Sequence, residues 1–205
     1  MYVPRQEGGA AVVNVAELVT RSKSGTVTQA ELNEVARMIE AGAPDRALYD
    51  LIYILGRSFS YDHEPLIARY LDYPADPWVA RCALEVLCRM WDRQETYSAD
   101  LRRFLVGVAW DEGEVRQIAI SAAGAYLKDH VDTEMLSLIV RRANLQNESQ
   151  LEREVATESL AVALGSSTSE IVLRDRSEPW DEWAAKVVQR ARLRLDSEGG
   201  SYNFE

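Results

Sequence analysis

The sequence has few of the residues and motifs that mark several common classes of protein. Among 205 residues there are two cysteines and two histidines. Cys82 and Cys88 are six residues apart, which places them about 9 Å apart along a helix axis, too far for a disulfide. We therefore expect two small apolar side chains in a reducing compartment. Neither G-x-G-x-x-G nor G-x-x-x-x-G-K occurs, so no recognisable phosphate-binding loop is present.

Long apolar runs are also missing. No stretch approaches eighteen consecutive apolar residues, and no basic-then-apolar segment opens the chain, because the run 10–13 is too short for a signal sequence. These patterns predict no membrane span and a cytoplasmic location.

Basic residues are fewer than acidic ones. The chain carries 23 basic and 33 acidic residues, a formal net charge of −10. Nucleic-acid binding draws most of its affinity from basic side chains at phosphates, so we expect no nucleic-acid partner. An acidic surface instead suits solubility and attraction to a basic protein.

A helical pattern repeats with a period of about 36 residues. Val79, Val115 and Leu151 each open an apolar helix pattern, and their spacing is 36 and 36. Between these helices lie others whose first apolar positions, at 66, 101 and 136, are separated by 35 and 35. A hairpin of two such helices cannot bury its apolar face alone and must stack on its neighbours.

The sequence therefore predicts an all-α protein, an α-α superhelix of hairpin repeats with a C-terminal capping helix. The expected helices span about 13–21, 28–42, 44–59, 63–73, 76–92, 98–110, 112–128, 133–144, 147–164 and 179–195. The expected divisions are an N-terminal tail and capping helix (1–27), the repeats (28–164), a linker (165–178) with a short extended piece at 171–173, the capping helix (179–196) and a tail (197–205).

The openings of two repeats resemble a known family. Asp76-Pro77-Trp78-Val79-Ala80-Arg81 and Asp111-Glu112-Gly113-Glu114-Val115-Arg116 are similar to the acidic residue, valine and arginine that open the second helix of HEAT repeats. The resemblance covers about 44–164. It implies a binding surface far more often than an active site, although fold alone does not fix function.

A docking groove is expected along the second helices of the repeats. The 36-residue register aligns polar positions beside apolar ones, and tyrosine and arginine are favoured interface anchors. The candidate partner-binding residues are Tyr49, Tyr53, Arg81, Glu85, Arg89, Gln117, Ser121 and Arg153. The alternative interpretation is an ordinary solvated helix face, with Arg81–Glu85 and Glu85–Arg89 ion pairs four residues apart.

No arrangement of residues predicts a catalytic, metal or cofactor site. His63 and His130 lie in different repeats and cannot be combined with a serine and an aspartate into a convincing triad. We therefore expect a non-catalytic protein-binding module, a scaffold or adaptor, in which an acidic surface faces a basic protein. One alternative is an immunity protein that neutralises a bacterial toxin, suggested by size and charge. Another is an enzyme of the HEAT-like bilin lyase type. The oligomeric state stays open.

Overall fold

The chain is all-helical in the computed structural model, which describes residues 14–144, 149–173 and 178–199. Those residues form eleven α-helices, one short 3-10 helix and one π-helical turn, and they contain no strand. Within the same ranges, no helix is both long and apolar enough to cross a membrane. The tails at 1–13 and 200–205 lie outside the described residues.

Every helix except α10 begins close to an expected start. In chain order the helices are α1 (Val15–Lys23), α2 (Gln29–Glu40), α3 (Asp45–Arg57), η1 (Tyr61–His63), α4 (Glu64–Ala68), α5 (Pro77–Glu85), η2 (Val86–Met90), α6 (Ser98–Val106), α7 (Glu114–Asp129), α8 (Thr133–Asn144), α9 (Gln150–Ala163), α10 (Thr168–Val172) and α11 (Trp180–Ser197).

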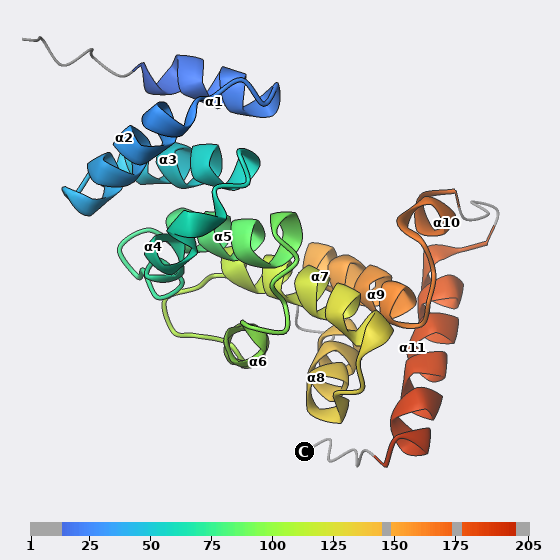
Figure 1. Ribbon diagram of the computed structural model, residues 1–205. Coiled ribbons are helices and arrows are strands. Elements are labelled where there is room, and N and C mark those ends of the chain that lie inside the picture. The colour runs from blue at the N-terminus through green and yellow to red at the C-terminus, as the bar shows by residue number, and fades with distance from the viewer. Residues whose placement is uncertain (1–13, 145–148, 174–177, 200–205) are drawn as a thin grey trace, which may run out of the picture.

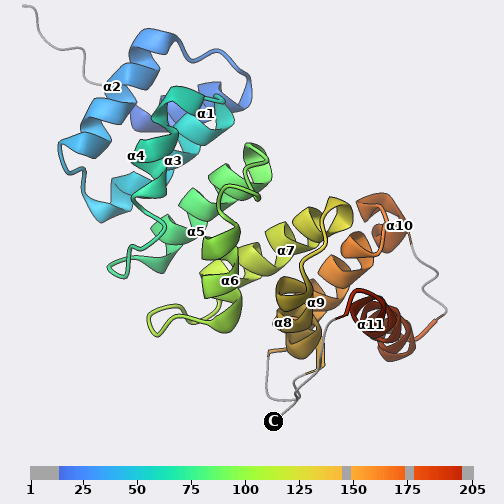
Figure 2. The same cartoon turned by 60° about the horizontal axis from the view of Figure 1, so that its bottom comes forward.

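The long helices pack on one another in chain order. Helix α3 contacts α5, α5 contacts α7, and α7 contacts α9, while α6 and α8 lie against one side of this row (Figure 1). Helix α11 runs in a different direction and packs on α8 and α9, as the turned view shows (Figure 2). The core is continuous along this row and consists mainly of leucine, isoleucine, valine and alanine.

Helices α7 and α9 approach each other closely. Gly124 lies in α7, and a Cβ atom added there would come within 2.6 Å of the backbone oxygen of Ser159. Real Cβ atoms do not approach an oxygen so closely, so a glycine is required for this crossing.

Aspartate side chains cap the N-terminal ends of α5 and α7. The Asp76 carboxylate accepts a hydrogen bond from the backbone N–H of Trp78 at 2.9 Å. The buried Asp111 carboxylate accepts three, from the N–H groups of Gly113, Val115 and Arg116, each at 3.0 Å. Such caps satisfy the N–H groups that a helix start leaves without partners.

Three arginines donate hydrogen bonds to carbonyls near helix ends that lie 31 to 37 residues earlier in the chain. Arg103 donates to the Leu71 carbonyl, Arg142 donates to the carbonyls of Leu105 and Val106, and Arg194 donates to the Ala163 carbonyl. A guanidinium at these positions satisfies free carbonyls and opposes the negative end of the helix dipole.

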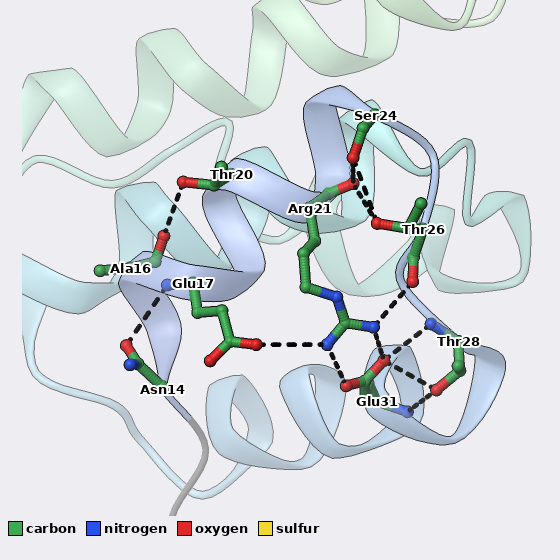
Figure 3. Close-up of polar contacts among 9 residues, drawn as sticks. All are labelled: Asn14, Ala16, Glu17, Thr20, Arg21, Ser24, Thr26, Thr28 and Glu31. Atoms are coloured by element: carbon green, nitrogen blue, oxygen red, sulfur yellow. Dashed lines mark hydrogen bonds and ion pairs between the residues drawn. The ribbon is translucent and has the colours of Figure 1, made fainter.

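A polar network joins α1 to α2 (Figure 3). Arg21 forms two hydrogen bonds with the Glu31 carboxylate, at 2.6 and 2.9 Å, and a third with the Thr26 carbonyl. Glu31 also completes a capping box with Thr28. These bonds lower the pKa of Glu31 to about 2. The network therefore holds the C-terminal end of α1 against the N-terminal end of α2.

The structure corrects three expectations about helix extent. The helix expected over 63–73 is a 3-10 turn followed by the five-residue α4, and the helix over 76–92 ends as the π-helical turn η2. The linker over 165–178 contains helix α10, where a short extended piece was predicted. A capping box between Ser167 and Glu170 begins that helix.

Candidate functional site

A cavity of about 360 Å³ lies where α5, η2, α7, α9 and α10 meet. We call it the α5–α10 groove. Its polar lining consists of Arg81, Arg89, Gln117, Ser121, Glu158, Ser159 and Thr168. Its apolar lining consists of Ile118, Val155, Val162, Ile171 and Val172.

Four of the eight candidate residues share this groove. Arg81 comes from α5 and Arg89 from η2, while Gln117 and Ser121 lie one turn apart on α7. Because α5 packs against α7, residues 36 apart in the chain are brought to one surface.

Among the described residues, Arg81 is the cation of the groove for which no anionic partner is found. Its guanidinium carbon lies 5.1 Å from the centre of the Trp78 ring, within the range of a cation–π interaction. No hydrogen bond or ion pair joins the Arg81 guanidinium to another side chain or carbonyl in the part of the chain that the structure describes. Its N–H groups are therefore available to a ligand.

Arg89 and Glu85 form one of the ion pairs expected for a solvated helix face. Their closest nitrogen and oxygen atoms are 3.5 Å apart. The other expected pair, Arg81 with Glu85, does not occur among the ion pairs of the described residues, because Arg81 lies over Trp78 instead. The two arginines of the groove thus differ: one is compensated locally and one is not.

Gln117 and Ser121 keep side-chain hydrogen-bonding capacity. Within the described ranges, neither the Gln117 amide nor the Ser121 hydroxyl forms a hydrogen bond, and both side chains are half-buried. By contrast, the Ser159 hydroxyl donates to the Val155 carbonyl at 2.7 Å. The α7 side of the groove therefore presents polar groups above an apolar floor.

The two candidate tyrosines lie outside the groove. Tyr49 and Tyr53 stack on each other along α3, with ring centres 6.5 Å apart. The Tyr49 carbonyl lies 3.6 Å from the Cys82 sulfur, so this pair flanks the N-terminal part of α5. Burial, followed by the nearby Cys82 and Glu85, raises the pKa of Tyr49.

Arg153 occupies a different place from the one expected. Its guanidinium carbon lies 5.9 Å from the Trp180 ring centre, and it lines a second cavity of about 340 Å³ between α8, α9 and α11. That cavity also contains Arg192, whose guanidinium donates to the Asn144 side chain at 3.0 Å. The row of aligned polar positions therefore divides between two surfaces.

The thiols are not suited to nucleophilic chemistry. Cys82 and Cys88 are free and buried. Burial raises the pKa of both, to about 12 for Cys88, so neither is a thiolate near neutral pH. Among the described residues, no group of three histidine, cysteine, aspartate or glutamate side chains could hold a metal ion.

Comparison of the chain with models of protein families, with curated proteins and with solved structures gave no match.

Proposed function

We propose that this chain is a HEAT-like helical repeat protein that binds another protein through the α5–α10 groove and catalyses no reaction. The packing of α3 on α5, α5 on α7 and α7 on α9 supports the repeat arrangement, because successive contacts join helices about one repeat apart.

One observation carries the binding role. Four residues selected from the sequence as partner contacts lie together on one cavity, and three of them, Arg81, Gln117 and Ser121, have polar groups that the described part of the fold does not use. A concave surface with an apolar floor and a few convergent polar groups is typical of a binding site.

The test compares two tryptophan variants of α7 in an affinity purification from the host at physiological salt. Ser121→Trp places a large ring inside the groove. Ala125→Trp places the same ring one turn further along, at an exposed position that does not line the groove. Thermal midpoints of both variants check that the fold is retained.

We expect one protein to co-purify with the wild type and with Ala125→Trp, and to be lost with Ser121→Trp. Loss with both variants or with neither would remove the groove as the binding surface. If the wild type itself retains no protein above the level of an untagged control, the binding role is wrong.

A second candidate is an immunity protein that inhibits a bacterial toxin. The net charge of −10 favours it, because acidic surfaces accelerate association with basic proteins. This candidate predicts a single stoichiometric basic partner, and protection of cells that express that partner. Several substoichiometric partners would favour a scaffold instead.

A further inference from the structure

The charge of the α5–α10 groove differs from that of the chain as a whole. The chain carries ten more acidic than basic residues, yet the groove contains two arginines and one glutamate. Arg89 is compensated by Glu85, and Glu158 has an interaction of its own. Among the described residues that line the groove, the positive charge that is left is that of Arg81.

Arg81 is held in position before any ligand arrives. Its side chain is half-buried, and its guanidinium lies against the Trp78 ring, which is itself 52 % exposed. A guanidinium that is fixed in this way loses less conformational freedom when it binds a carboxylate. The planar fork of N–H groups also matches a carboxylate in a two-bond geometry.

An apolar floor lies beside this cation. Ile118 and Ile171 close the bottom of the groove with little exposure, and Val155 and Val162 are half-buried along α9. At the rim, Val172 is 60 % exposed. These side chains would be removed from water by an aliphatic or aromatic residue placed in the groove.

We propose that the α5–α10 groove binds a peptide segment of the partner protein in which a carboxylate side chain lies next to an aliphatic residue. Arg81 binds the carboxylate, the floor receives the aliphatic side chain, and Gln117 and Ser121 bond the peptide backbone. The proposal rests on the function proposed above and specifies what the partner presents to the groove.

This local preference is compatible with a partner of net positive charge. Net charge acts over several ångströms to tens of ångströms and governs the rate of encounter, whereas the groove selects by direct contact. A basic partner that presents one acidic segment satisfies both.

The experiment is a selection from a phage-displayed library of random twelve-residue peptides against the full chain. It is repeated with Arg81→Glu and with Arg46→Glu, an exposed arginine of α3 that does not line the groove. The two variants have the same change of charge and differ only in its place.

We expect the wild type and Arg46→Glu to enrich peptides in which aspartate or glutamate neighbours valine, isoleucine or leucine. Arg81→Glu should lose these peptides and enrich lysine- or arginine-containing ones. For one enriched acidic peptide, Arg81→Gln should weaken binding by roughly tenfold or more, and Arg46→Gln should not.

Enrichment of peptides without a carboxylate, no enrichment over blank beads, or equal binding of acidic peptides to Arg81→Glu would each overturn the proposal. These results can be told apart from failure of the proposed function. A host protein that is lost with Ser121→Trp but retained by Arg81→Glu keeps the groove as a docking surface and refutes its preference for a carboxylate.

Discussion

Glu152 is the buried charge on which the junction of α7, α8 and α9 depends. Its side chain is 3 % exposed in the first turn of α9. Its Oε1 atom lies 2.9 Å from Nε of Arg116 and 3.7 Å from Nη1 of Arg142. Glu152→Gln preserves the size of the side chain and removes its charge, leaving two arginines close together with little access to water.

Loss of one partner from a buried ion pair costs about 3–5 kcal/mol. The lower end applies here, because Arg116 and Arg142 keep side-chain exposures of 16 % and 13 % and Arg142 keeps its bonds to the Leu105 and Val106 carbonyls. A loss of about 3 kcal/mol in a chain of this length lowers the thermal midpoint by about 6–12 °C.

The assay is thermal unfolding followed by circular dichroism, with urea unfolding as a second measure. The control is Glu154→Gln on the same helix, whose carboxylate accepts one exposed hydrogen bond from Gln150. We expect the control to change stability by less than about 0.5 kcal/mol. Adding Arg116→Met to Glu152→Gln should restore part of the loss, because it removes one uncompensated charge. A midpoint of Glu152→Gln equal to that of the control would refute the assigned role.

Two further predictions concern pH and thiol reactivity. The hydrogen bonds from Arg21 and Thr28 lower the pKa of Glu31 from about 4.5 to about 2, so the charged carboxylate stabilises the fold above pH 4.5 and this contribution disappears as the pH falls toward 2. Glu31→Gln should therefore reduce the fall of the thermal midpoint between pH 5 and pH 2. Glu40→Gln, which changes an exposed residue at the end of the same helix, should leave that fall unchanged. Equal slopes for Glu31→Gln and the wild type would contradict the stabilising role of the network between α1 and α2. Cys82 and Cys88 are buried with raised pKa values, so an aromatic disulfide reagent at pH 8 should label neither in the native protein and both in denaturant; rapid native labelling of either thiol would contradict the packing.

Helix positions and the groove residues of α5 and α7 could be predicted from the sequence because they depend on local periodicity. Val79 and Val115, 36 residues apart, are both fully buried. Arg81 and Gln117 have the same separation and both line the groove. Equivalent positions on neighbouring helices share an environment as long as each helix packs on the next in the same way.

That condition fails at α9. Arg153 and Thr157 lie one turn apart, so they share a face of the helix. The 36-residue spacing aligns Arg153 with Arg81 and Gln117, but Arg153 lies over Trp180 of α11 and Thr157 is fully buried. Leu151, expected to open the third apolar pattern, is 54 % exposed. Because α9 also packs on α8 and α11, a different face of it is buried.

The start of helix α10 is marked in the sequence by the pattern of a capping box. Ser167 and Glu170 have the same spacing as Thr28 and Glu31, and both pairs form capping boxes in the structure. The serine-rich run around them favoured a loop. The contacts of the arginines that cap distant helix ends could not be predicted from the sequence. A long flexible side chain can contact such a carbonyl only after the helices have packed.

A single glycine explains why the starts of α5 and α7 do not keep one spacing. The capping residues Asp76 and Asp111 are 35 apart, whereas the buried valines that follow them, Val79 and Val115, are 36 apart. Helix α5 begins directly after its aspartate, but α7 begins three residues after Asp111, with Gly113 at φ +129° between them. That backbone angle is strained for any residue with a Cβ atom. The extra residue lets the Asp111 carboxylate reach three N–H groups, and it turns Arg116 toward Glu152 while Gln117 takes the groove position of Arg81. One arginine, Arg116, thus belongs to the buried ion cluster, whereas Arg81 lines the groove.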